Sequence, residues 1–418
     1  MKLTKAERSW IMYDWANSAY SLVIVTAILP IYFKAVSSNA GISGVDSTVI
    51  WGYTSSAATL VISILAPFLG TIADYFGYKK KIFTLFALSG MITTFGLAIV
   101  SSQSWVALLV VYVLSHMGFQ GANVFYDGFL VDVTSDERAD KISAYGYGLG
   151  YIGSALLFVI VMILQVTKGF GYLNTIIVTQ LSFVLTALWW TLFSVPFFKN
   201  VRQIHGVKRQ SHSIRRSFTR LMTTIKDIRQ YRLVALFLLA YFFYIDGVDT
   251  IFTMATAFGV DMGIDSNHLI IILLVVNLIA FPFTILYGWL SERFGTKALI
   301  TVAIDVYVLI CLCAMFMKTA FDFWILALLV GTSQGGIQAL SRSYFAKIIP
   351  KDKANEFFGF YNIFGKFSAI LGPIIFSTMT KLTGKSQFGI ASLMILFIIG
   401  GLILLFAVRD SKNSRLNV

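Results

Sequence analysis

The sequence has few charged residues and few cysteines, and each shortage excludes a class of protein. Charged residues make up 13% of the 418 residues, roughly half their share in a soluble domain. The two cysteines, Cys311 and Cys313, lie in one apolar run, so we expect neither a disulfide framework nor a zinc site. Hydrophobic residues make up 57% of the chain, and the mean hydropathy is +0.78. These values predict an integral membrane protein without a cofactor.

Metal-binding and nucleotide-binding motifs are also absent. The sequence has no H-E-x-x-H motif and no clustered acidic metal motif, so we expect neither an enzyme nor a metal site. It has no P-loop, which excludes ATP-driven transport by this chain alone. The net charge of +13 does not indicate binding to nucleic acid. The positive residues instead cluster in short loops between apolar runs, as membrane topology requires.

Twelve apolar runs are each long enough to cross a bilayer, which takes a helix of about 20 residues. They are too long for strands and lack the alternation of a β-barrel. A closed bundle of helices satisfies the backbone in lipid. The predicted fold class is therefore an all-α membrane protein with about twelve transmembrane helices. The predicted spans are residues 10–36, 49–73, 82–100, 105–131, 142–166, 172–198, 233–260, 269–290, 298–317, 323–343, 357–379 and 388–408.

The loops between these spans predict the orientation of the chain. One alternate set of loops, together with both termini, holds most of the Lys and Arg, and the other set has only Lys34, Lys168, Lys318, Lys381 and Lys385. By the positive-inside rule both termini are cytoplasmic, in agreement with an even number of spans. The first span has no cleavage site after it and is longer than a signal sequence, so we interpret it as uncleaved. We expect a multi-pass protein of the cell membrane.

Residues 199–232 form the one long, polar and strongly basic stretch. It lies between the sixth and seventh spans and divides the chain into an N-terminal half, residues 1–198, and a C-terminal half, residues 233–418. The simplest interpretation is a cytoplasmic linker held near anionic lipid headgroups. A regulatory or partner-binding role is the alternative.

The two halves share an internal repeat at the ends of the second and eighth spans. The offset is 218 residues throughout, and the fourth and tenth spans repeat Gln-Gly at an offset of 214 residues. Two six-span halves built alike are common in transporters. The matching residues are Gly70, Asp74, Gly77 and Lys79 in the first half, where Lys80 follows, against Gly288, Glu292, Gly295 and Lys297 in the second, and Gln120 and Gly121 against Gln334 and Gly335.

The loop after the second span resembles the signature loop of the major facilitator superfamily. The resemblance implies two pseudo-symmetric six-helix halves, with Asp74 at a cytoplasmic helix end capping a helix of the other half and holding one of two transport states. A carboxylate suits that position because it satisfies free N–H groups and the helix dipole. The loop departs from the family pattern at Tyr75, where a basic residue is usual, and the common arginine of the fourth span is missing. These departures argue against the usual scheme of drug/proton antiport.

Two further stretches narrow the resemblance to a subgroup. Y-D-W-A-N-S-A-Y at residues 13–20 and Y-I-D-G-V-D-T-I at residues 244–251 resemble signatures of the "unknown major facilitator" family. That family is similar to fungal vacuolar effluxers that release amino acids. The resemblance covers the whole chain and implies efflux of an amino acid or a related metabolite.

Polar residues inside four spans recur at helical spacing, so each set forms a stripe on one helix face. Ionisable groups in a span are costly and are functional candidates by default. In the resembled superfamily, spans 1, 4, 7 and 10 line the cavity, which makes these stripes candidates for a shared path for substrate and ion. The candidates are Asp14 and Asn17 in span 1, His116, Gln120, Asn123 and Asp127 in span 4, Asp246 and Asp249 in span 7, and Gln334 and Gln338 in span 10.

Each stripe also has a purely structural interpretation. Asp14 can be an interfacial carboxylate, Asp127 can pair with loop cations, and amides often join helices. Asp246 lies deep in its span, and Asp249 one turn later shares its face, so one of the two could carry a proton. Lys366 in span 11, with Asn362 one turn before it, needs a partner, and Asp246 or Asp249 is the candidate.

Asp305 does not fit this pattern. It lies in the middle of span 9, which faces lipid in the resembled fold. We therefore expect that it turns inward, unless the register of the span differs from the predicted one.

The sequence thus favours a secondary transporter of a small solute, with the lipid bilayer as its surroundings and a proton or sodium ion as a possible coupling ion. Three alternatives stay open. One is an exporter of drugs or organic anions, the second is a non-transporting receptor or scaffold, and the third is a lipid-modifying enzyme in the membrane. The polar stripes argue against a scaffold, which does not need a costly polar path.

Overall fold

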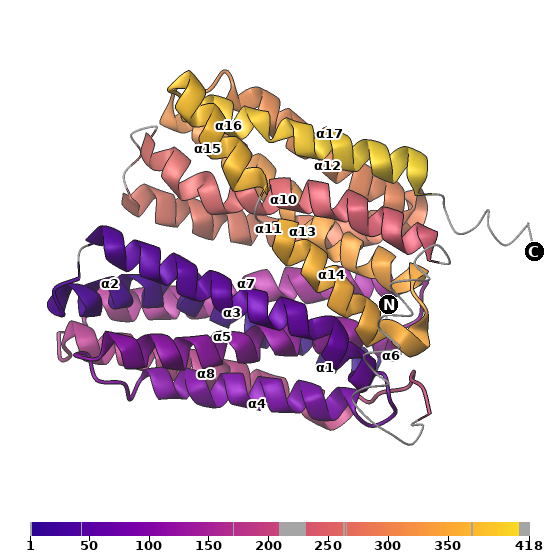
Figure 1. Cartoon of the computed structure of the whole chain (residues 1–418), viewed down its shortest axis with the longest axis horizontal. Coiled ribbons are helices and arrows are strands. Elements are labelled where there is room, and N and C mark those ends of the chain that lie inside the picture. Colours follow the sequence, from indigo (N-terminus) through magenta and orange to yellow (C-terminus); the bar gives the residue numbers. More distant parts are fainter. Residues whose placement is uncertain are drawn as a thin grey trace, which may run out of the picture. The chain divides into compact units, whose positions relative to one another are not determined.

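The computed structural model is helical in all the regular structure that it describes (Figure 1). It describes residues 2–42, 44–169, 171–208, 231–261, 264, 266–368 and 371–408. Within these residues the only β contact is an isolated parallel bridge between Tyr75 and Val207. The bulk of the predicted basic linker, residues 209–230, lies outside the described residues, as do residues 409–418.

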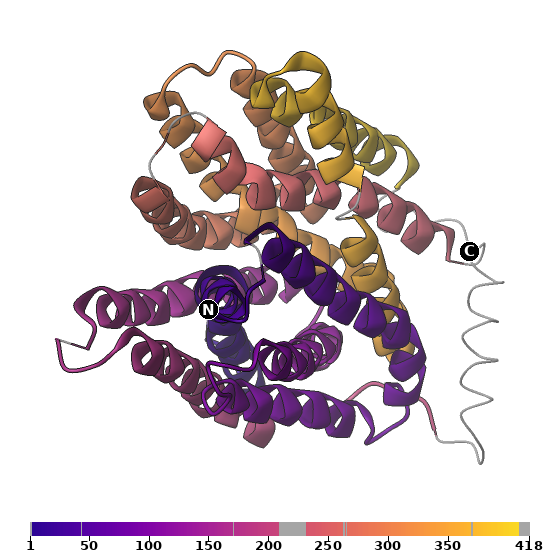
Figure 2. The same ribbon diagram turned by 60° about the vertical axis from the view of Figure 1, so that its left-hand side comes forward.

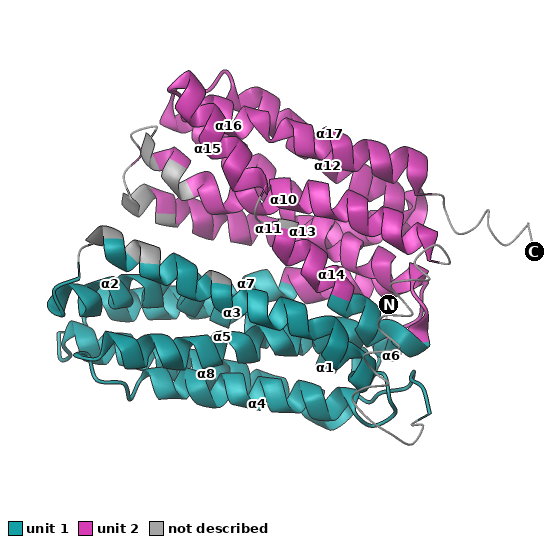
Figure 3. Ribbon diagram, viewed as in Figure 1, with its two compact units in different colours: residues 1–133, 149–217, 352–359 teal, residues 134–148, 218–351, 360–418 magenta. Residues whose placement is uncertain are grey.

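The chain divides into two compact units (Figure 3). Unit 1 contains residues 1–133, 149–217 and 352–359. It therefore holds most of the N-terminal half and the first turn of α14, while the first part of α7 belongs to unit 2. Its helices are α1 (Lys5–Tyr20), the π-helix Ser21–Ile28, α2 (Leu29–Asn39), α3 (Gly44–Ala73), α4 (Lys79–Leu97), α5 (Trp105–Gly128), α6 (Leu130–Val133), the larger part of α7 (Ala139–Thr167) and α8 (Thr175–Asn200).

Unit 2 contains residues 134–148, 218–351 and 360–418. Its long helices run beside one another as a bundle, as those of unit 1 do, which the turned view also shows (Figure 2). Its helices are the start of α7, α10 (Arg232–Asp261), α11 (Ser266–Phe294), α12 (Thr296–Ala314), α13 (Ala320–Ile348), most of α14 (Ala354–Ser368), α15 (Leu371–Thr383), α16 (Ser386–Ser392), α17 (Met394–Leu402) and the π-helix Ile403–Ala407.

The helices follow the predicted spans closely. In the described residues, eleven helical stretches are long and apolar enough to cross a membrane. The third predicted span is the remaining helix, α4, which begins with three lysines and contains several hydroxyl residues. The prediction of an all-α membrane protein with about twelve spanning helices is confirmed.

Span 1 departs from a single regular helix. It passes from α1 through the π-helix Ser21–Ile28 into α2, directly before Pro30. Proline has no N–H to donate, which favours irregular helical hydrogen bonding in the preceding turn. Span 11 lies within one candidate membrane stretch, Lys351–Thr383, of which residues 369–370 are outside the described part.

Candidate functional site

The loop after α3 places the Asp74 side chain against the first turn of α14, within unit 1. Its carboxylate accepts hydrogen bonds from the backbone N–H groups of Asn355 at 2.9 Å and Glu356 at 3.2 Å, and from the Asn355 side chain at 2.8 Å. Asp74 is buried, with 1% of its surface exposed. These N–H groups have no partner within the helix, so the carboxylate caps α14.

Two glycines let the loop and the first turn of α14 come this close. A Cβ at Gly70 would overlap the Asn355 carbonyl, and one at Gly128 would overlap the Asn355 side chain. Gly77 ends the loop with φ +81°, a left-handed conformation that favours glycine. The Gly70–Asp74–Gly77 pattern therefore has one structural reason for each of its three residues.

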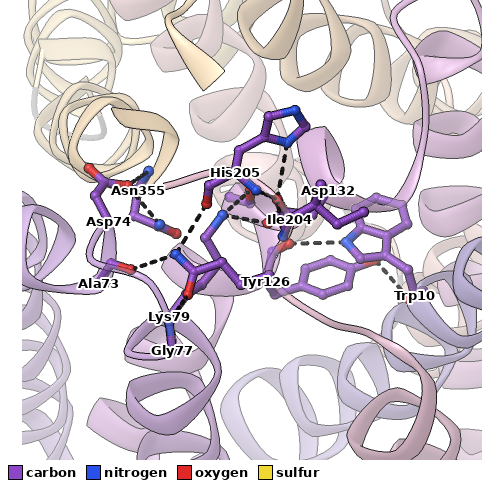
Figure 4. A network of polar contacts seen from close by, with 12 residues as sticks. Trp10, Ala73, Asp74, Gly77, Lys79, Tyr126, Asp132, Ile204, His205 and Asn355 are labelled. Carbon is purple, nitrogen blue, oxygen red and sulfur yellow. Dashed lines mark hydrogen bonds and ion pairs between the residues drawn. The ribbon is translucent and has the colours of Figure 1, made fainter. Parts of the chain in front are cut away.

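A buried ion pair lies beside this cap, also in unit 1 (Figure 4). The Lys79 ammonium is 2.6 Å from Asp132 and also donates to the Gly128 carbonyl at 3.1 Å. Burial acts to raise the pKa of Asp132, but the Lys79 charge and the hydrogen bonds from His205 and Lys79 outweigh it and leave the pKa lowered. Asp132 is therefore ionised at neutral pH and compensates the buried lysine.

The equivalent loop in unit 2 has a different arrangement. Glu292 pairs with Lys141 at 2.5 Å, and its side chain is 44% exposed. Gly288 lies against Ala144, where a larger residue would overlap it, and Gly295 has φ +89°, like its counterpart Gly77. The glycines of the repeat thus keep their roles, while the acid of the repeat forms a surface ion pair.

Asp140, at the start of α7, is the buried acid of this region of unit 2. It accepts hydrogen bonds from Thr296 and Ser343, both at 2.6 Å, and pairs with Lys347 at 2.7 Å. One turn later, the Ser143 backbone and hydroxyl oxygens accept hydrogen bonds from the buried guanidinium of Arg342. These contacts join α7 to α12 and α13.

Four candidate residues of spans 1 and 4 make side-chain hydrogen bonds within unit 1. Asn17 donates to Asn123, which joins α1 to α5. His116 contacts Thr59 on α3 at 3.1 Å and Gln120 one turn along α5 at 3.4 Å. Asp14 is buried, and Asp127 is half-buried near the end of α5. The predicted stripes of spans 1 and 4 are thus brought together by direct contacts.

In unit 2, the Asp246 carboxylate faces the first residues of α15. Its two oxygens are 2.9 and 2.8 Å from the backbone nitrogen of Gly372, and the Thr250 hydroxyl donates to it at 3.3 Å. Asp246 is fully buried. A Cβ at residue 372 would overlap Thr250 and crowd Asp246, so this approach requires glycine. Asp246 therefore binds the backbone of α15 directly, a contact that its position in the sequence did not reveal.

The remaining candidates of unit 2 lie on α10, α13 and α14. Asp249 is half-buried and lies within electrostatic range of Lys366, which is exposed. Gln334 is buried, and Gln338 and Asn362 are half-buried. The candidates of spans 1 and 4 lie in unit 1 and those of spans 7, 10 and 11 in unit 2, so one path shared by all of them stays a prediction.

Asp305 corrects one expectation. Its side chain is exposed on α12, so it does not turn inward into unit 2. Its neighbours Ala303, Ile304 and Tyr307 are buried, which shows that the α12 face carrying Asp305 points away from the core of the unit.

Comparison with known families identifies the chain. A family model described as "Vacuole effluxer Atg22 like" matches residues 4–416. The chain belongs to this family. This Atg22-like protein is 52% identical over 414 residues to an uncharacterised MFS-type transporter, YxiO, of Bacillus subtilis, covering 99% of this chain and 97% of YxiO. It is also 23% identical to the autophagy-related protein 22 of Vanderwaltozyma polyspora, covering 97% and 91% of the two chains.

The fold of this Atg22-like protein is that of the major facilitator superfamily. The human organic anion transporter MFSD10 matches it with a TM-score of 0.72 at 14% sequence identity, covering 95% of this chain and 99% of MFSD10. The resemblance predicted from the loop after the second span and from residues 13–20 and 244–251 is therefore confirmed. The chain is a multi-pass membrane protein of the MFS transporter family.

Several residues of these networks in the Atg22-like chain were not predicted from the sequence. Asp132 follows span 4 and Asp140 precedes span 5, where acids beside basic loops are common and carry no distinctive signal. Gln203 and His205 lie in the basic stretch after α8, which the sequence marks only by its charge. Their roles depend on contacts with residues distant in the sequence, so spacing alone could not identify them.

Proposed function

We propose that this Atg22-like chain is a secondary transporter that exports an amino acid or a related small metabolite by alternating access, coupled to a proton or a sodium ion. The family description as effluxers and the membership of the MFS transporter family support this proposal. In this scheme the halves 1–198 and 233–418 rock around a central site, as secondary transporters built from repeats do. Both termini are cytoplasmic, and the protein resides in the cell membrane.

The fully buried Asp246 carries this proposal. A carboxylate within a span costs several kcal/mol unless it has a partner, so such a residue is a functional candidate. Its partner here is the backbone N–H of Gly372, which an ionised carboxylate binds more strongly than a neutral one. We propose that Asp246 couples ion binding to the position of α15 through this contact.

Asp249 and Lys366 supply the second part of the proposal. The two opposite charges lie on neighbouring helices of unit 2 and interact electrostatically. A substrate or a proton that neutralises one of them weakens the pair, which gives substrate binding a direct effect on α14. We propose that this pair binds the charged groups of the solute.

The third part of the proposal concerns three acids. Asp74 contacts α14, and Asp140 and Glu292 contact the partners described above. Each joins a residue of one sequence half to a residue of the other half. We propose that they stabilise one of the two transport states and break in the other. Asp74 is then a gate acid, as the resemblance of its loop implies.

The test is flux of a pooled, labelled amino-acid mixture into liposomes that contain the purified protein, under an imposed pH gradient. Asp246→Asn keeps an oxygen that can accept from Gly372 but loses the charge. We expect flux to follow the gradient in the unsubstituted protein and to be lost or uncoupled in Asp246→Asn. Asp305→Asn is the matched control, because it neutralises another acid of a span in unit 2 that is exposed, and we expect it to keep coupled flux.

Other results would change the proposal in defined ways. Flux that Asp246→Asn leaves coupled to the gradient would remove Asp246 from the coupling mechanism. Absence of flux for every amino acid, from folded protein, would contradict the amino-acid substrate. The same liposomes loaded with organic anions would then test the alternative exporter, and sodium gradients would replace the pH gradient to test the coupling ion.

A further inference from the structure

Residues 201–208, which we call the strap, follow α8 directly and run across the loop that carries Asp74. They begin the basic stretch for which a headgroup-bound linker was the simplest interpretation. The Val207 N–H donates to the Asp74 carbonyl at 2.8 Å, and the Phe76 N–H donates to the Val207 carbonyl at 3.2 Å. Lys80 donates to the Val201 carbonyl at 2.7 Å. The strap is therefore bound to the loop by backbone contacts on both sides of Tyr75.

Gln203 of the strap contacts the backbone on both sides of the gate acid. Its side-chain oxygen accepts from the Gly77 N–H at 2.9 Å, and its side-chain nitrogen donates to the Ala73 carbonyl at 3.2 Å. Asp74 lies between these two points, so one amide side chain fixes the segment that carries it. Gly206 allows the close approach, because a Cβ there would lie 2.6 Å from the Asp74 carbonyl oxygen.

Asp132 also holds the strap, through contacts that Figure 4 shows. Its Oδ1 accepts from the N–H groups of Ile204 at 2.9 Å and His205 at 2.7 Å, and the His205 ring nitrogen is 3.2 Å away. Its Oδ2 pairs with Lys79, which follows the loop directly. One continuous network of polar contacts within unit 1 thus joins the loop, Lys79, Asp132 and the strap.

We propose that the strap positions Asp74 on the first turn of α14, so that docking of this segment regulates the gate. Gln203 and Asp132 are then positioning residues, since they touch neither substrate nor ion. A released strap leaves the segment around Asp74 free to move, which weakens the cap on Asn355 and Glu356. The consequence for transport rests on the function proposed above, whereas the structural coupling between the strap and α14 does not.

Amide hydrogen exchange of the full-length protein in lipid nanodiscs, without any solute, tests the coupling. Gln203→Ala removes the contacts with Ala73 and Gly77, and Gly206→Ala pushes the strap away from Asp74. We expect both variants to speed exchange in residues 354–359 by about fivefold or more, together with exchange in the strap, because each loses contacts that oppose local opening. Ile204→Ala is the matched control, because its side chain is 63% exposed and its N–H stays available to Asp132.

The outcomes separate this inference from the proposed function. Faster exchange in the strap with residues 354–359 unchanged, in both variants, would show that the strap docks without positioning Asp74 and would overturn the proposal. An equal effect from Ile204→Ala would also overturn it, because the effect would then be nonspecific. Since no solute is present, coupled exchange supports the strap even if no amino acid is transported, and liposome flux tests the transporter separately.

Discussion

The loops around Asp74 and Glu292 carry the same sequence pattern but are stabilised in different ways. Asp74 is 1% exposed, caps α14 and rests on the strap. Glu292 is 44% exposed on its side chain and forms an ion pair with Lys141. In the region of unit 2 around Glu292, the buried acid is Asp140, which lies on α7 rather than on the loop. The comparison teaches that a repeat preserves backbone geometry, through Gly77 and Gly295, more strictly than the role of its charged residue.

The largest effect is expected where the Asp74 loop depends on the buried pair. Asp132→Asn keeps an oxygen for the strap but leaves the Lys79 ammonium buried without a compensating charge. Removing one partner of a buried pair costs about 3–5 kcal/mol. We expect a loss of that order in the free energy of unfolding of unit 1, measured by denaturant unfolding in detergent. Lys79→Met leaves the Asp132 carboxylate with the N–H groups of Ile204 and His205 as donors, so it should lose less than Asp132→Asn.

The pH dependence of the same pair sharpens this prediction. The pKa of Asp132 is lowered in the folded protein, so its contribution to stability is complete above the ordinary pKa of aspartate, about 3.9. The contribution is lost as the pH falls through the lower folded pKa. The stability difference between the unsubstituted protein and Asp132→Asn should therefore be constant near neutral pH and shrink below about pH 4. A difference that does not shrink below about pH 4 would contradict this account.

A medium effect is expected from Asp74→Ala. The substitution leaves the N–H groups of Asn355 and Glu356 without their acceptor in a buried place, at a cost of about 1–3 kcal/mol. We expect faster hydrogen exchange confined to the first turn of α14 and the loop, with lower thermal stability. Asp74→Asn, which keeps one acceptor oxygen, should recover part of the loss. If both variants match the unsubstituted protein, the cap does not stabilise α14.

The smallest effect is expected from Glu292→Ala. A partly exposed ion pair contributes about 0–1 kcal/mol, and Lys141 keeps its contact with the Trp289 ring, 5.9 Å from the ring centroid. We expect a change in thermal stability close to the error of the measurement, and a further decrease of any effect at high salt. A loss as large as that of Asp74→Ala would remove the difference between the two loops.

The existence and order of the helices could be predicted because burial in lipid demands long apolar runs, which the sequence displays directly. The sequence marks Gly70 and Gly77 only through the repeat, and the structure supplies the reasons, which are a close approach at Gly70 and a left-handed conformation at Gly77. The capping of α14 by Asp74 was implied by resemblance, and the contacts of Asn355 and Glu356 agree with it.

The roles of Asp246, Gln203 and Asp305 were harder to predict. A carboxylate deep in a span indicates importance, but its partner, the Gly372 N–H, lies 126 residues away in the sequence, and spacing does not reveal it. The strap is bound largely through backbone groups, which every residue has, so its composition carries no signal. Asp305 was expected to turn inward because its span was compared with a fold, whereas its own neighbours determine which face is exposed.

The contact between Asp74 and α14 has a consequence for the synthesis of the protein. The two partners are separated by 281 residues, and a ribosome that adds about 5–20 residues per second needs roughly 15–55 seconds to make that stretch. Until Asn355 emerges, the nascent chain holds an ionised Asp74 at the membrane surface with no helix to cap. Unit 1 is therefore completed late in translation, by a short segment from near the end of the chain. Truncated products that stop before this segment leave unit 1 incomplete.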